Sequence, residues 1–107
     1  MRKTIETVNF TKTEKLTRDI EKLFDKIGAF HERILALDVY LKLNSDGPVP
    51  DRHVGVRVFL PNQEIYVDVR GEDNFRGLAF QVYQKIRRSL SNLKEYIDPV
   101  TEGLPAV

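Results

Sequence analysis

The sequence predicts an α+β fold in which two helices lie on one face of a four-stranded sheet. Two segments carry apolar residues at steps of three and four, which is typical of helices, and four others are short and apolar or alternating, which is typical of strands. Their order along the chain is β-α-β-β-β-α. Since each strand has one clearly apolar face and both helices need apolar cover, we expect a two-layer sandwich with both helices on that face.

The first half of the chain supplies a strand, a helix and a second strand. Residues Arg2 to Phe10 are rich in Thr, Val, Ile and Phe and predict a strand, after which Thr11 and Thr13 offer N-cap hydroxyls. The helix is expected to stop at Gly28, and the apolar side chains that define it are Leu16, Ile20, Leu23, Phe24 and Ile27. The next strand alternates from Ile34 to Leu43. Its inward side chains are predicted to be Leu35, Leu37, Val39, Leu41 and Leu43.

A loop and a hairpin follow. The loop from Asn44 to Asp51 contains Ser-Asp-Gly and two prolines, and we expect it to be the most mobile part of the body. The turn at Pro61-Asn62-Gln63-Glu64 joins the third and fourth strands. Earlier in the chain, the first helix connects the first two strands, and we expect this crossover to be right-handed, which makes those two strands parallel. The inward residues of the hairpin are predicted to be Val54, Val56, Val58, Leu60, Ile65, Val67 and Val69.

The last helix is expected from Asn74 to Lys94, after two acids, Glu72 and Asp73, that suit the positive end of a helix. Its apolar stripe consists of Phe75, Leu78, Ala79, Val82, Ile86, Leu90 and Leu93. Two prolines and a glycine follow Tyr96. We therefore expect one domain over residues 1–97 and a flexible C-terminal tail over residues 98–107.

Composition narrows the class of protein. A chain of 107 residues with 41% hydrophobic content can bury one core without staples, and the absence of cysteine excludes disulfides and thiolate zinc sites. No signal peptide or long apolar run is present, which favours a soluble cytoplasmic protein without membrane contact. His31 and His53 belong to no catalytic or metal-binding motif, and no glycine pattern cradles phosphate. We expect no enzyme activity, cofactor, metal or small-molecule substrate.

The strongest functional signal is a basic run in the last helix. Between Asn74 and Lys94 the chain has no acid, although its net charge is only +1, and its cations are Arg76, Lys85, Arg87, Arg88 and Lys94. Helical projection places Phe80 and Tyr83 on one flank with Arg76, Arg87 and Lys94, and places Lys85 and Arg88 on the other flank. Cations interleaved with exposed rings suit a polyanion with stackable bases. The alternative is an ordinary solvated helix face.

The first helix adds a second basic line, Lys15, Arg18, Lys22 and Lys26, at steps of three, four and four residues. The acids Glu14, Glu21 and Asp25 occupy a neighbouring face, so intrahelical ion pairs and a solvated face are the alternative here. With the helices side by side, up to nine cations would form one surface, which we predict to be the binding site.

The open face of the sheet is the competing site. It carries three aromatic and three basic residues in a mixture that resembles sheet-based RNA modules, namely Tyr40, Phe59, Tyr66, Lys42, Arg57 and Arg70. The glycine-aromatic signature of those modules is absent, however.

Five stretches of the chain, taken in order, are typical of one known family: TEKLTRDIEKLFDKIGAF (Thr13 to Phe30), VYLKL (Val39 to Leu43), the Pro61-Asn62 hairpin, Glu72-Asp73-Asn74-Phe75 and KIRRSL (Lys85 to Leu90). On these stretches the chain resembles, from about Thr4 to Lys94, the family of ribosome hibernation-promoting factors, also described as ribosome-associated inhibitors or sigma-factor modulation proteins. Ser89 stands where the family usually has Gln, and Gly77 lies in the first turns of the last helix.

The resemblance implies a fold similar to a double-stranded-RNA-binding domain, and a translation inhibitor that lodges in the mRNA and tRNA decoding channel of the small ribosomal subunit and silences idle ribosomes, as in stress or stationary phase. It implies contacts to ribosomal RNA from Lys26, Lys42, Lys85 and Arg88, whereas Lys15, Arg18, Lys22, Arg76 and Arg87 rest more on charge. It also implies a short-form member, expected to be a monomer when free. The alternative function is a protein-interaction module that modulates a transcription (sigma) factor through the open sheet face.

Overall fold

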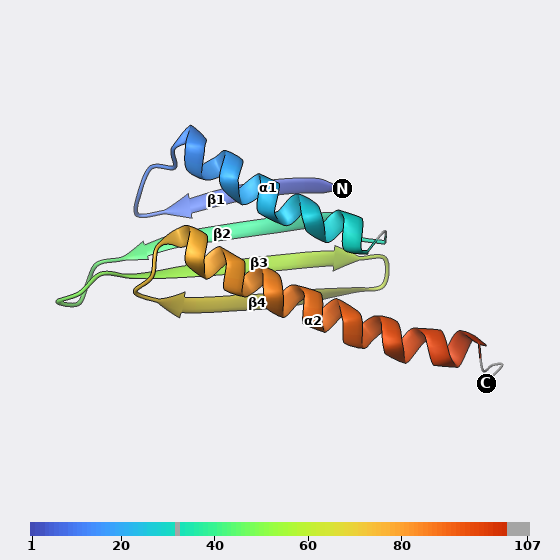
Figure 1. Cartoon of the computed structure of the whole chain (residues 1–107). Coiled ribbons are helices and arrows are strands. Elements are labelled where there is room, and N and C mark those ends of the chain that lie inside the picture. The colour runs from blue at the N-terminus through green and yellow to red at the C-terminus, as the bar shows by residue number, and fades with distance from the viewer. Residues whose placement is uncertain (32, 103–107) are drawn as a thin grey trace.

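A computed structural model describes residues 1–31 and 33–102, with side chains described as far as residue 93. The element order is the predicted one, and the bounds are β1 Arg2–Val8, α1 Glu14–Phe30, β2 Ala36–Asn44, β3 Asp51–Leu60, β4 Gln63–Gly71 and α2 Phe75–Glu102. The four strands form one sheet in the order β1-β2-β3-β4, and both helices lie on the same face of it (Figure 1). The predicted two-layer sandwich is confirmed.

The sheet is mixed. β1 pairs with β2 in parallel, with Ile5 opposite Val39, while β2–β3 and β3–β4 are antiparallel. A parallel pair needs a long crossover, and α1 supplies it. The register leaves one face of β2, β3 and β4 apolar, and this face receives both helices. The prediction of an apolar face on each strand fails for β1, which places Lys3, Ile5 and Thr7 on that side, opposite Leu37, Val39 and Leu41.

The core lies between the sheet and the two helices. α1 contributes Ile20, Phe24 and Ile27, each 1% exposed or less. The other fully buried side chains come mainly from β2, β3 and α2, as the alternation and the helical stripe predict, and include Leu37, Val39, Leu41, Val54, Val56, Val58, Leu78, Val82, Ile86 and Leu90. Burial of these stripes fixes which helix side chains face solvent.

Several element ends differ from the prediction. β1 ends at Val8 rather than Phe10, because Asn9 adopts a positive φ of 69° and turns Phe10 out of the strand to stack on Phe75, 4.7 Å away between ring centroids. Leu35, predicted to face inward, precedes β2 and is 58% exposed.

The predicted stop of α1 at Gly28 is wrong, since the helix continues to Phe30. Gly28 does not have a positive φ, and a Cβ there would lie 3.3 Å from the Met1 Cε atom. The glycine therefore accommodates the N-terminal side chain instead of ending the helix.

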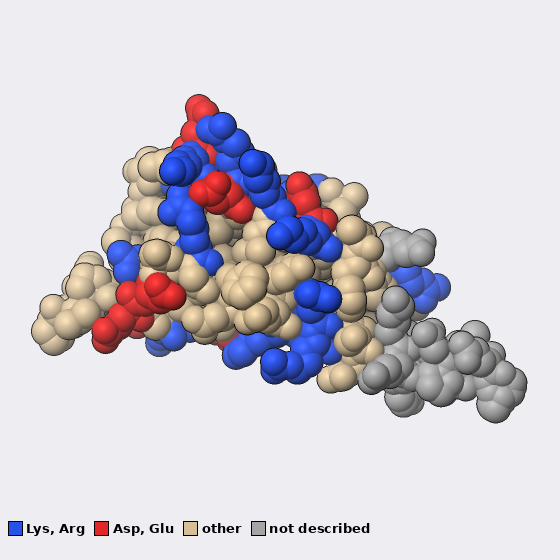
Figure 2. Space-filling view, in the orientation of Figure 1, with Lys and Arg blue, Asp and Glu red and all other residues tan. Residues whose placement is uncertain are grey.

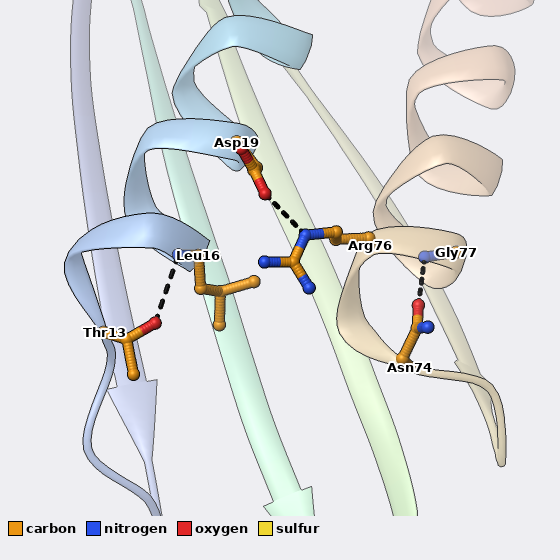
Figure 3. A network of polar contacts seen from close by, with 6 residues as sticks. All are labelled: Thr13, Leu16, Asp19, Asn74, Arg76 and Gly77. Atoms are coloured by element: carbon orange, nitrogen blue, oxygen red, sulfur yellow. Dashed lines mark hydrogen bonds and ion pairs between the residues drawn. The ribbon is translucent and has the colours of Figure 1, made fainter.

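Both helices begin at polar caps on the same end of the sheet. The Leu16 amide donates to the Thr13 hydroxyl at 3.1 Å, as predicted, and the Gly77 amide donates to Asn74 Oδ1 at 2.8 Å (Figure 3). The backbone of α2 is helical as far as Glu102, so the helix passes the boundary expected at residue 97; residues 103–107 of the expected tail lie outside the described part of the chain.

Candidate nucleic-acid interface

The cations of α1 stand on the side of the helix that faces away from the sheet. Burial of Ile20, Phe24 and Ile27 turns the opposite face to solvent, and all four predicted cations of this helix are exposed: Lys15, Arg18, Lys22 and Lys26. Lys and Arg side chains gather along α1 and over part of α2 in the space-filling view, with acidic side chains between some of them (Figure 2). The helices therefore present a common outer surface, although it is not uniformly basic.

An acid on α1 neutralises one of the predicted site residues. Arg76 Nε donates to Asp19 Oδ2 at 2.6 Å, which joins the first turn of α2 to α1 (Figure 3). The hydrogen bond and charge of Arg76 hold the pKa of Asp19 below its usual value. Arg18 is paired more loosely with Glu14, at 3.4 Å and four residues away, and Asp25 pairs with Lys3 of β1. Part of the Arg76 charge is thus used in an ion pair that joins the two helices.

One flank of α2 faces α1 and combines aromatic rings with a guanidinium. The ring centroids of Phe80 and Tyr83 lie 5.9 Å apart with 30° between the planes. The Arg87 Cζ atom lies 5.8 Å from the Tyr83 centroid and 5.1 Å from the centroid of Phe30, at the end of α1. We call these four residues the ring-arginine row. Its three members on α2 occupy the flank that helical projection predicted.

A shallow groove of about 320 Å³ adjoins this row, lined by Phe30, Gln84, Arg87, Arg88 and Ser91. Arg88 shares the groove with Arg87, so it lies nearer to α1 than the predicted opposite flank. Lys85 is exposed one residue beyond Gln84 and does not line the groove. The side chain of Lys94 lies outside the described residues.

The described cations of the helix face differ in how far they are neutralised. Two of the predicted site residues, Arg18 and Arg76, form ion pairs. Among the described side chains, no ion pair involves Lys15, Lys22, Lys26, Lys85, Arg87 or Arg88. The structure therefore brings together, from both helices, six predicted cations that form no close ion pair among the described side chains, although Asp19 lies near enough to Lys15 and Lys22 for their charges to lower its pKa.

The open face of the sheet is chemically different. His53 Nε2 lies 2.8 Å from Asp68 Oδ2, and Arg57 Nε lies 3.6 Å from Glu64 Oε2, so two pairs form across strands. Lys42 and Arg70 form no ion pair among the described side chains. The Tyr66 ring lies over Gly55, where a Cβ would come within 2.5 Å of the hydroxyl oxygen. Partial burial there and the nearby Asp68 raise the pKa of Tyr66.

Lys42 is on that open face, because its register partner in β3 is His53. It therefore lies on the opposite side of the sheet from the helices. A single flat surface cannot contact Lys42 and the helix cations together, so its predicted RNA contact would need a partner that reaches around the sheet.

Both histidines contact other groups of the protein, His53 through Asp68 and His31 through the backbone. His31 is 8% exposed, and its Nδ1 accepts a hydrogen bond from the Arg33 amide at 3.3 Å. Over the described residues there is no cluster of three or more His, Asp or Glu side chains that could hold a metal ion, and no helix is long and apolar enough to cross a membrane.

Two members of the interface were missed by sequence reasoning. Asp19 was not among the acids considered on α1, although it lies four residues after Lys15 and three before Lys22 and so shares their face. The sequence indicates Phe30 only as the last residue of the stretch Thr13 to Phe30 that resembles the family. Its contact with Arg87 depends on how the two helices cross, which spacing within one helix does not reveal.

No protein-family model and no curated protein matches the sequence. Solved structures do share its fold. A ribosomal subunit interface protein from Coxiella burnetii is similar with a TM-score of 0.75 and 19% identity, over 89% of this chain and 99% of that chain. The N-terminal domain of Protein Y from Thermus thermophilus is similar with a TM-score of 0.72 and 17% identity, over 87% of this chain and 99% of that one. The chain thus shares its fold with both of these proteins.

Proposed function

We propose that this protein is a ribosome-associated translation inhibitor that binds the small ribosomal subunit in the decoding channel through the exposed faces of α1 and α2. The observation that carries the proposal is the exposed surface built from both helices, on which six cations form no close ion pair among the described side chains. A protein with a net charge of +1 does not need such a local excess for solubility. Ribosomal RNA is the polyanion that the fold and charge together favour.

The fold supports this choice of partner over other nucleic acids. Both similar structures are nearly fully covered by the comparison, and one is named as a ribosomal subunit interface protein. The site lies on regular helices whose outer side chains are positioned by a buried core, so it can meet a rigid RNA surface without refolding. Occupancy of the channel where mRNA and tRNA lie would by itself block translation.

The test is co-sedimentation with purified small and large subunits, together with a cell-free translation assay. The double variant Lys85→Glu, Arg88→Glu should lose binding to small subunits and lose inhibition, because it places two negative charges on the proposed surface. Both side chains are exposed and form no ion pair with another described side chain, so their replacement should change the free energy of unfolding by within about 0.5 kcal/mol each.

The matched control is Arg57→Glu, Arg70→Glu, which makes the same formal charge change on exposed residues of the open sheet face. It should bind and inhibit nearly as the wild type does. Equal loss in both double variants would mean that only the overall charge matters. Wild-type binding by the Lys85, Arg88 variant would refute the helix-face site.

A further inference from the structure

We propose that the ring-arginine row, Phe80, Tyr83, Arg87 and Phe30, is a stacking site for an unpaired nucleotide base of single-stranded RNA. This deepens the proposed function, on which it rests, by naming the form of RNA that the helix face recognises. Charge alone attracts any polyanion and does not distinguish duplex from single strand. The rings add a contact that only an exposed base can make.

Phe80 is an unusual residue for a solvated helix face. It is 49% exposed, although the helix has a continuous buried stripe that could have taken an aromatic side chain, and it is one of few large hydrophobic residues so exposed among those described. Its ring is stacked with Tyr83, three residues later, so the pair forms a platform on one flank. A platform with one end open to solvent is suited to extension by a further flat ring.

Arg87 continues the platform and adds charge. Its guanidinium lies within 6 Å of the rings of Tyr83 and Phe30, a distance at which cation–π attraction holds it in place. No carboxylate pairs with it among the described residues. Its positive charge is therefore both oriented by the rings and available to a phosphate.

The adjoining groove supplies the polar contacts that a nucleotide needs. Gln84 and Ser91 can donate and accept hydrogen bonds, and Arg88 adds a second cation beside Arg87. A base stacked on the rings would thus have its phosphate near two guanidinium groups. In duplex RNA the bases are already stacked inside the helix, so the same surface could make only the phosphate contacts.

The chain offers a direct reporter, because it contains no tryptophan. In the variant Phe80→Trp the only indole would be part of the platform. Its fluorescence should be quenched by oligouridylate or oligoadenylate at low salt, and should be little changed by an abasic ribose-phosphate chain of the same length or by duplex RNA. Quenching of the same size by the abasic chain or the duplex would overturn the stacking site.

The matched control is Tyr66→Trp on the open sheet face. Tyr66 is 52% exposed, and its ring centroid lies 5.7 Å from the Arg57 Cζ atom. It is therefore an aromatic side chain about as exposed as Phe80, and it also lies beside an arginine. Its indole should not respond to the single strand. An equal response at both positions would show that any exposed ring is sufficient, and that outcome would also refute the proposal.

Affinity for the small subunit provides a second readout. Phe80→Ser should weaken binding roughly 5- to 150-fold, the range for loss of one stacked base, and Phe80→Leu should weaken it nearly as much because it keeps an apolar side chain without a ring. Tyr66→Ser should leave binding unchanged. If Phe80→Leu binds like the wild type, the contact is apolar rather than stacking, and the inference fails.

Failure of this inference can be told apart from failure of the proposed function. If Phe80→Ser binds normally while Lys85→Glu, Arg88→Glu does not, the helix face binds RNA through charge alone. If both variants bind normally, the proposed function itself is wrong. The melting temperature of each variant, compared with that of the wild type, checks that the substitution has not unfolded the protein.

Discussion

The two faces of this molecule carry similar residue types but arrange them differently. On the open sheet face, His53 pairs with Asp68 and Arg57 with Glu64, while two further cations, Lys42 and Arg70, form no ion pair among the described side chains. On the helix face, several cations have no acidic partner among the described side chains. The difference shows that a net charge near zero says little about partners, because pairing within a surface decides how much charge is left for a ligand.

The charges of the α1 face include both favourable and unfavourable pairs: Glu14 forms an ion pair with Arg18, and Asp19 interacts with Lys15 and Lys22. Arg18 and Lys22, and again Lys22 and Lys26, are like charges four residues apart, a spacing that destabilises a helix by about 0.2–0.5 kcal/mol per pair. The core of α1 requires Ile20, Phe24 and Ile27, but it places no demand on the exposed positions. The buried core therefore does not by itself account for positive charge at these positions.

The largest expected effect separates the faces directly. Replacing Arg76, Arg87 and Lys94 by Gln should weaken small-subunit binding by roughly 30-fold or more near 0.1 M salt, because each lost phosphate contact removes a counterion-release contribution. Inhibition in a cell-free translation assay should fall in parallel. Filter binding or sedimentation at fixed salt measures the change.

The paired variant replaces Tyr40, Phe59 and Tyr66 by Ser and should keep binding nearly intact. A stacked base contributes about 1–3 kcal/mol, so its loss would be plain if the sheet carried the contact. Thermal unfolding must accompany this measurement, since the Tyr66 ring packs over Gly55. Loss of binding in the sheet variant, with retention in the helix variant, would reverse the assignment of the faces.

The helices and strands of this fold could be predicted from the sequence, because the spacing of apolar residues along each element reflects which side chains are buried. Alternation from Val54 to Leu60 and the stripe of α2 correspond to side chains that are buried in the structure. Element ends were less predictable, since they depend on contacts between distant residues. Phe10 leaves β1 to meet Phe75, and Gly28 admits Met1 without ending α1.

The candidate site was predictable to a lesser extent, for a related reason. Exposure of the helix cations follows from the period of the buried stripe, which the sequence contains. The pairing of Arg76, unlike that of Arg18 with Glu14 within α1, depends on how α1 and α2 lie against each other. The contacts Asp19–Arg76 and Phe30–Arg87 both cross that boundary, and neither is encoded by spacing within one helix.

Salt dependence sharpens the comparison. If about five cations displace counterions from single-stranded or structured RNA, log affinity should fall against log salt with a slope of roughly −3.5 to −4.5, so that doubling the salt weakens binding roughly 11- to 23-fold. Neutralising Lys85 and Arg88 to Gln should reduce the slope by about 1.4, from two contacts at about 0.7 each. Neutralising Arg57 and Arg70 should not change it, and a slope near zero in the wild type would contradict the RNA interface.

A smaller effect distinguishes paired from unpaired cations within the helix face. Arg88→Gln should weaken small-subunit binding several-fold, because this side chain has no acidic partner among the described residues and lines the groove. Arg76→Gln should weaken it less, since Asp19 already neutralises part of that charge. Titration of both single variants under one salt condition tests the order, and a greater loss at Arg76 would show that the ion pair opens on binding.

The smallest effect concerns the ion pair that joins the helices. The pKa of Asp19 is lowered in the folded protein by its hydrogen bond to Arg76, so the pair should stabilise the fold above the unfolded pKa of about 3.9 and lose this effect as pH falls through the lower folded pKa. Asp19→Asn should therefore melt slightly below the wild type at pH 7, and the difference should shrink toward pH 3. Asp46→Asn, at an exposed loop carboxylate, is the control and should show no such change. A difference that persists undiminished at pH 3 would mean that the Asp19 charge is not its source. The same variant frees Arg76, so its affinity for small subunits should rise rather than fall if the helix face binds RNA.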